Sequence, residues 1–177
     1  METAKLQVTA LFEALIAGDK VRVSELLTEQ PQLANVENED GLTPLAYAGH
    51  LGFEEIVQTL LAHGAEVNAV THSTIAYIPS NTALHAAIAG ERSLSVIRLL
   101  LSHGADSGIV DSDGQTPLHS AAFHTDRTEI VQLLLDHGAE VSKRATDGET
   151  ALQIAEKQGN EKVAALLKQM TTQLRNE

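Results

Sequence analysis

The chain repeats one pattern of apolar and polar positions, and residues 111–141 carry its clearest copy. There, a turn signal at residues 113–114 precedes a short segment with small apolar side chains, and residues 130–135 then form a wide apolar stripe. Apolar side chains that recur every three or four residues lie on one face of a helix, so this pattern predicts two consecutive helices. The His-Gly pair at residues 137–138 predicts the end of the second helix, because glycine adopts the left-handed backbone conformation that closes many helices.

A threonine opens the first helix of each copy. Its hydroxyl oxygen can accept hydrogen bonds from the free N–H groups of a helix start, and proline, which follows two of these threonines, fits the first helical position. The threonines are separated by 39, 34 and 34 residues: they are Thr43, Thr82, Thr116 and Thr150. A unit of about 33 residues with apolar surface on both sides can bury that surface only against neighbouring units, which predicts a stack of repeats.

Two short motifs recur in phase with this period. Thr-Pro-Leu-His stands at residues 116–119 and Thr-Ala-Leu-His at 82–85, and His-Gly-Ala occurs at 63–65, 103–105 and 137–139. One such motif alone is weak evidence, whereas several phased units with the same helix stop are specific. On these motifs and this period, the chain resembles the ankyrin repeat family over nearly its whole length.

The resemblance implies an all-α fold, an ankyrin-repeat solenoid of about five helix-turn-helix units with β-hairpin fingers that project to one side. The expected organisation is a single domain over residues 1–177. Its parts are an N-terminal capping repeat at 1–36, repeats at 37–69, 81–110 and 111–144, a finger insertion at 70–80, a C-terminal capping repeat at 145–170, and a frayed tail at 171–177.

The acidic charge is unevenly distributed. The net charge is −12, and residues 23–91 carry nine acidic side chains and no lysine or arginine. Nucleic acid is therefore a poor candidate partner, because its binding requires lysine and arginine to neutralise phosphates, and anionic membranes are disfavoured for the same reason. The acidic segment either keeps the protein soluble and monomeric, or steers a basic partner toward it.

The finger between the second and third copies is longer than the others. From Gly64 to Thr82 there are 18 residues, against 12 from Gly104 to Thr116, so six residues are inserted. The inserted segment is rich in β-branched and aromatic residues and carries no charge apart from a histidine, so it can extend into a longer hairpin. Because insertions in repeat proteins often lie on the binding face, this segment is either a contact loop or a neutral insertion that folds back over the groove.

The residue types that support catalysis or metal binding do not form a recognisable site in the sequence. The chain has no cysteine, and the three histidines of the His-Gly-Ala motifs are expected about 10 Å apart, one helix-packing step, too far for shared ligation of a metal. Residues 111–115 resemble the opening of a calcium loop but lack its later acidic ligands, so a turn is the better interpretation. Neither an enzyme nor a cofactor is expected.

The resemblance implies recognition of another protein through finger tips and the concave row of helices. The partner is expected to have an apolar centre and a basic flank, and the alternatives are an inhibitor or antitoxin-like regulator of a basic enzyme, or a small-molecule binder. A monomer is expected, in the cytoplasm, because residues 1–20 contain no signal peptide or membrane span. The candidate contact residues are Glu37, Glu39, Asp40, His50, Leu51, Tyr77, Ile78, Ile109, Asp111, Phe123 and His124.

Overall fold

The computed structural model describes residues 2–175. These residues form ten α-helices and one 3-10 helix, and no strand occurs in this part of the chain. The chain divides into two compact units, Met1–Ala105 and Asp106–Glu177. The elements are α1 (Glu2–Ala17), α2 (Lys20–Glu29), η1 (Pro31–Asn35), α3 (Pro44–Leu51), α4 (Glu54–Ala62), α5 (Ala83–Gly90), α6 (Leu94–Ser102), α7 (Pro117–His124), α8 (Thr128–Asp136), α9 (Ala151–Gln158) and α10 (Glu161–Arg175).

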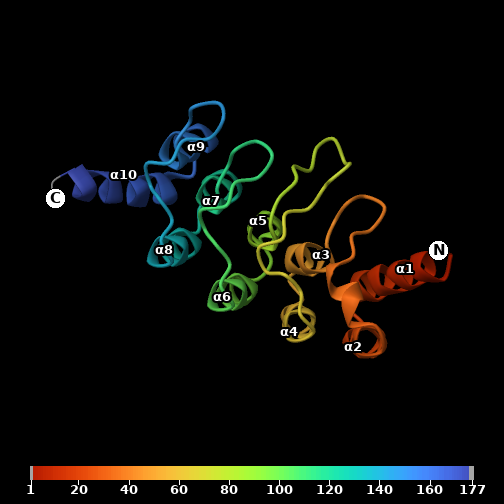
Figure 1. Cartoon of the computed structure of the whole chain (residues 1–177). Coiled ribbons are helices and arrows are strands. Elements are labelled where there is room, and N and C mark those ends of the chain that lie inside the picture. The colour runs from red at the N-terminus through yellow and green to blue at the C-terminus, as the bar shows by residue number, and fades with distance from the viewer. Residues whose placement is uncertain (1, 176–177) are drawn as a thin grey trace. The chain divides into compact units, whose positions relative to one another are not determined.

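The first unit stacks three helix pairs. Helix α1 packs on α2, α3 on α4 and α5 on α6; α3 also packs against both α1 and α5, and α4 against both α2 and α6 (Figure 1). The leucines of the apolar stripes fill the space between these helices, and Leu15, Leu27, Leu60 and Leu100 are completely buried. Each such burial stabilises the fold by about 2 kcal/mol relative to an exposed side chain.

The second unit stacks two helix pairs in the same way. Helix α7 packs on α8 and on α9, and α10 packs on both α8 and α9. Polar contacts join the pairs: the Asn160 side chain donates to the Ala122 carbonyl at 2.9 Å, and the Asp126 carboxylate accepts from the Val163 N–H at 3.0 Å. The predicted fold class, an all-α ankyrin-repeat solenoid, is confirmed by these helix pairs.

The threonines begin the first helices as the sequence predicts. Thr43, Thr82, Thr116 and Thr150 are the residues that precede α3, α5, α7 and α9. In α7 and α9 the third helical residue completes a capping box, His119 in the first case and Gln153 in the second. The N–H groups at these helix starts are thereby hydrogen-bonded within their own turn.

The four fingers are tight loops. They are the first finger (residues 38–42), the long finger (71–81), the third finger (111–115) and the fourth finger (145–149). Each neck is closed by a backbone hydrogen bond of 2.9–3.1 Å, in which Asn38, Thr71, Asp111 and Ala145 donate to the carbonyls of Leu42, Asn81, Gln115 and Glu149. Within residues 2–175 the only β pairing is an isolated bridge between Arg144 and Thr150, so the β-hairpin character expected for the fingers is limited to their necks.

The ends of the chain differ from the expected pattern in one respect. Helix α10 continues to Arg175, so residues 171–175 of the predicted tail are helical. Residues 176–177 lie outside the described part of the chain. The Thr171 and Thr172 hydroxyls donate to carbonyls four residues earlier, which adds polar contacts along the last turns.

The loop between α5 and α6 holds a strained residue. Glu91, at the C-terminal end of α5, has φ 54°, a left-handed conformation that disfavours side chains with a Cβ, whereas α3 and α9 end in the same conformation at Gly52 and Gly159. Replacing Glu91 with glycine is therefore expected to raise the free energy of unfolding by about 0.5–1 kcal/mol. Glycine relieves the backbone strain of the folded chain, but part of this gain is offset because glycine increases the conformational entropy of the unfolded chain. Urea denaturation measures this.

The matched control is Glu91→Gln, which removes the charge but keeps the side chain. It should leave the free energy of unfolding unchanged. If the glutamine and glycine variants gained stability equally, the charge of Glu91 and not its backbone conformation would be the cause.

Candidate partner-binding surface

The long finger is docked along the first finger by backbone hydrogen bonds. The N–H of His72 donates to the Gly41 carbonyl, and the N–H of Thr74 donates to the Asp40 carbonyl, both at 2.9 Å. The two fingers approach so closely that a Cβ on Gly41 would lie 2.0 Å from the His72 carbonyl oxygen, and Gly41 itself has φ 74°. The contact between the fingers therefore requires glycine at position 41.

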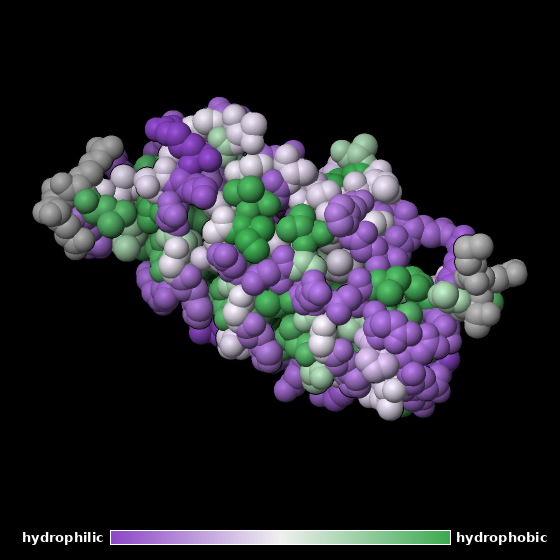
Figure 2. All heavy atoms as spheres, viewed as in Figure 1, coloured by the Kyte–Doolittle hydropathy of each residue, from purple (hydrophilic) through white to green (hydrophobic). Residues whose placement is uncertain are grey.

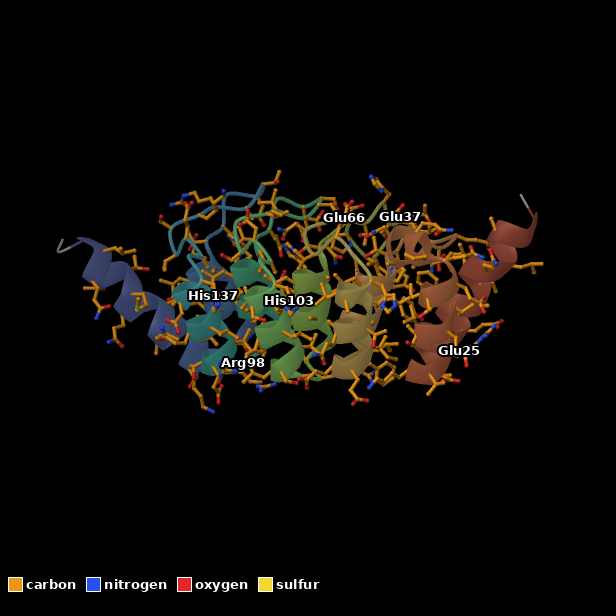
Figure 3. The ribbon with its side chains drawn as sticks, turned by 60° about the horizontal axis from the view of Figure 1, so that its bottom comes forward. Glu25, Glu37, Glu66, Arg98, His103 and His137 are labelled. Carbon is orange, nitrogen blue, oxygen red and sulfur yellow. The ribbon has the colours of Figure 1, made fainter. Side chains whose placement is uncertain are left out.

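A side-chain contact reinforces this docking. The Glu37 carboxylate accepts hydrogen bonds from the N–H of His72 at 3.0 Å and from its ring Nδ1 at 2.8 Å. Because a carboxylate only accepts, the imidazole must carry a proton on Nδ1. Glu37 and Glu66 lie on the finger side of the first unit, whereas Glu25 lies away from it on α2 (Figure 3). We call residues 37–42 together with the long finger the finger platform.

The long finger is fixed at its neck and open at its tip. Thr71 is completely buried, and its hydroxyl oxygen accepts from the N–H of Asn81 at 2.9 Å. At the tip, the N–H of Ile78 donates to the Ile75 carbonyl and closes a turn. This turn holds Tyr77 with 85% of its surface exposed, while Ile78 is half-buried. Green and pale spheres mark this uncharged tip, beside purple ones (Figure 2).

The acidic residues of the platform differ in their partners. Glu37 binds His72, and Glu39 forms an exposed ion pair with Lys5 at 2.6 Å. The hydrogen bond and charge of the Lys5 ammonium lower the pKa of Glu39, and Glu39 in turn raises the pKa of Lys5. Asp40 is exposed, and no cation among the side chains of residues 4–174 pairs with its carboxylate.

The other two candidate residues of the first unit lie at the end of α3. His50 is exposed, and its Nδ1 lies 3.3 Å from the Ala86 carbonyl of α5. Leu51 is half-buried. His50 is thus oriented by a hydrogen bond between neighbouring repeats but keeps an exposed edge.

The second unit places its candidates differently. Phe123 is 47% exposed and packs edge-on against His124, with ring centroids 4.9 Å apart. Ile109 is half-buried, and its neighbour Val110, which is not among the candidate contact residues, is 40% exposed. Asp111, in contrast, is buried.

The Asp111 carboxylate holds its own finger together. It is 8% exposed, and one oxygen accepts from the N–H groups of Asp113 and Gln115, both at 2.9 Å. Short acidic side chains often close turns in this way. The proposed contact surface therefore excludes Asp111.

His119 forms the polar centre of the second unit. Its Nδ1 accepts from the Thr116 N–H at 3.2 Å, so the ring proton is on Nε2, which donates to the Glu149 carbonyl at 3.2 Å. Burial lowers the pKa of His119, and the hydrogen bond to Glu149 and the charges of Asp147 and Asp111 only partly oppose this. Protonation of the His119 Nδ1 would also place an N–H donor opposite the N–H donor of Thr116, so that this hydrogen bond would be lost.

The lowered pKa predicts a pH dependence of stability. The unfolded chain takes up the His119 proton as the pH falls below about 6.5, while the folded chain does not, so the free energy of unfolding should decrease from that pH toward the folded-state pKa and be constant above it. Urea denaturation as a function of pH measures this slope.

The control is His119→Gln, since Gln153 forms the equivalent capping box in α9. In the glutamine variant, the His119-dependent decrease in the free energy of unfolding below about pH 6.5 should be absent. An unchanged slope would show that other groups cause it.

The remaining histidines and acids do not form a metal site in the described residues. The rings of His63, His103 and His137 each bond through Nδ1 to the carbonyl four residues earlier, at 2.8, 2.9 and 2.8 Å. Across residues 2–175 there is no group of three or more histidine, cysteine, aspartate or glutamate side chains arranged to hold a metal ion. No helix in the same range is long and apolar enough to span a membrane.

Comparison with known proteins supports the fold and defines the family. The chain is 36% identical over 108 residues to the mouse B-cell lymphoma 3 protein homolog. This aligned stretch covers 61% of this chain and 22% of the mouse protein. It is 48% identical over 63 residues to human ankyrin repeat domain-containing protein 49, covering 32% of this chain and 25% of that protein. A putative ankyrin repeat protein of fowlpox virus is 36% identical over 77 residues, covering 44% and 21%.

The chain thus spans about a quarter or less of the length of these relatives. A family model described as ankyrin repeats (3 copies) matches residues 2–71 and 73–145, most of the chain. The motifs at the helix starts, the stacked helix pairs and this match agree, and the protein belongs to the ankyrin repeat family.

Proposed function

We propose that this protein is a non-catalytic module that binds another protein, chiefly through the finger platform of its first unit. Ankyrin repeats generally serve as protein–protein interaction modules. The observation that carries the proposal is the docking of the long finger on the first finger, which holds Tyr77 almost fully exposed at a fixed position. An exposed aromatic side chain on an ordered loop is typical of a contact residue.

The contact surface that we propose has an uncharged centre and an acidic border. Tyr77 and Ile78 form the centre, Glu39 and Asp40 lie on the border, and His50 and Leu51 extend the surface to the end of α3. Glu37 supports this surface through its hydrogen bonds to His72 of the long finger. Because these fingers are already joined in the free protein, their side chains lose little conformational entropy on binding.

The charge of this surface suggests a partner with a basic flank. Acidic border residues steer such a partner and raise its association rate more than its final affinity. In the second unit, Phe123 and His124 at the end of α7, and Ile109 before the third finger, are further candidate contact residues. The single-domain organisation, the monomeric state and the cytoplasmic location remain predictions.

The test is a pull-down from a lysate of the source organism at low and moderate salt. It compares the intact chain with a variant in which residues 71–78 are replaced by a short turn. We expect the intact chain to retain a protein that the shortened chain loses. A protein that both chains retain equally would rule out the finger platform as the contact.

Charge variants test the steering. Glu39→Gln with Asp40→Asn removes two charges from the platform, and Glu140→Gln with Glu156→Gln removes two from exposed sites in the second unit. Only the first pair should lower the association rate of the retained protein at low salt. A tight, stoichiometric complex with one basic enzyme would point to an inhibitor.

A further inference from the structure

The tip of the long finger offers an aromatic face that the chain itself leaves uncovered. Tyr77 is 85% exposed, and the turn that holds it, closed by the bond between Ile78 and Ile75, contains no charged residue. Aromatic faces attract cations, and guanidinium groups stack on them especially well. No lysine or arginine occurs between residues 23 and 91, so no cation from this stretch competes for the ring.

An exposed acid lies beside the limb of the long finger that leads to this tip. The Asp40 carbonyl accepts from the N–H of Thr74, three residues before Tyr77, so the backbone of Asp40 borders the limb that leads to the tip. Glu37 and Glu39 already bind His72 and Lys5, whereas Asp40 is exposed and no cation among the side chains of residues 4–174 pairs with its carboxylate. Of the three platform acids, Asp40 is therefore the one available to an incoming cation.

Resting on the proposed function, we propose that the partner protein presents an arginine flanked by apolar residues, whose guanidinium stacks on Tyr77 and pairs with Asp40. Arginine fits better than lysine, because its planar group can lie on the ring while its N–H groups hydrogen-bond a carboxylate. The half-buried Ile75 and Ile78 receive the apolar neighbours. The net charge of −12 disfavours a second copy of this chain as the partner.

The probe is a set of three peptides that differ in one residue. Acetyl-Gly-Leu-Arg-Leu-Gly-amide is compared with its lysine and citrulline counterparts, of which citrulline keeps the planar group but loses the charge. Each is titrated at millimolar concentration into the full ¹⁵N-labelled chain, and amide shifts are followed by NMR. The arginine peptide should shift the amides of Asp40 and residues 74–78, and bind about 2- to 5-fold more tightly than the lysine peptide.

Variants assign the effect to the two side chains. Tyr77→Leu keeps an apolar side chain but removes the aromatic face, and should weaken the arginine peptide about 2- to 5-fold. Tyr77→Phe keeps the face and should bind as the parent does. Asp40→Asn should weaken binding, whereas Glu66→Gln, the same charge change at an exposed site in the first unit, should not.

The outcomes separate this inference from the proposed function. Equal shifts with the arginine and citrulline peptides, or equal affinity for arginine and lysine, would overturn the inference. So would shifts confined to His50 and Leu51, or no shifts with any peptide. In each of these cases the proposed function stands if the pull-down still shows a partner that depends on residues 71–78, and fails if it does not.

Discussion

Replacing Gly41 with alanine is expected to separate the two fingers of the platform. The added Cβ would lie 2.0 Å from the His72 carbonyl oxygen, and alanine at φ 74° is strained as well. The left-handed conformation costs about 1–2 kcal/mol, and the two lost backbone hydrogen bonds about 1 kcal/mol each. We therefore expect the free energy of unfolding to fall by about 3 kcal/mol in urea denaturation.

Gly148→Ala is the matched control. Gly148 follows an aspartate in the fourth finger as Gly41 does in the first, and it has φ 84°, but nothing lies within 4 Å of an added Cβ. This variant should lose only the conformational cost, about 1–2 kcal/mol. Equal losses in the two variants would show that contact between the fingers contributes no stability.

The second large effect is expected at Gly90, where α5 packs against α3. A Cβ at this position would lie 2.1 Å from the His50 carbonyl oxygen and 2.9 Å from its carbon. Because the obstructing atoms are backbone, they cannot rotate away, and the helices must move apart. Gly90→Ala should therefore lower the free energy of unfolding by about 3 kcal/mol, as measured by urea denaturation.

Gly49→Ala provides the comparison at the same helix interface. Its Cβ would lie 3.3 Å from the Ala83 carbonyl oxygen, a tight contact that small shifts can relieve. Both alanines gain about 1 kcal/mol of helix propensity, so Gly49→Ala should change the free energy of unfolding by no more than about 1 kcal/mol in either direction. If Gly49→Ala lowered the free energy of unfolding as much as Gly90→Ala does, the close contact between position 90 and the His50 backbone would not explain the effect.

The helices could be predicted because their signals are local. Thr43 and Thr116 cap the helices that their own neighbours form, and the leucines that recur every three or four residues are buried as their spacing predicts. His119 and Gln153 complete capping boxes with residues three positions away. In each case the partner lies within one helical turn, so the sequence alone contains the interaction.

The site could be predicted only in part, because its contacts join segments far apart in the chain. His72 looked like an isolated histidine in an uncharged loop, and only the structure places it against Glu37. The sequence also cannot show whether a short acidic side chain faces solvent or closes its own turn. Asp40 is exposed, whereas Asp111, in a similar Asp-Gly finger, is buried.

The backbone strain at Glu91 also cannot be predicted from the sequence. Thr82 and His103 are 21 residues apart, against 20 between Thr43 and His63, so the sequence shows one extra residue in this unit. It does not show which residue must adopt the left-handed conformation. The length of the segment from Gly64 to Thr82 predicts an insertion in the long finger. Its β-branched residues predict a longer hairpin, but residues 71–81 form no strand, and a backbone hydrogen bond from Thr71 to Asn81 joins the two limbs at the neck.

The account depends most on the claim that the two fingers form one platform in the free protein. Amide hydrogen exchange of the full chain, followed by NMR, tests this directly. The N–H groups of His72 and Thr74, which donate across the platform, should exchange at least about 10-fold more slowly than the exposed N–H of Tyr77 at the tip. Exchange of all three at the same rate would show that the long finger moves independently, and would contradict a preformed binding surface.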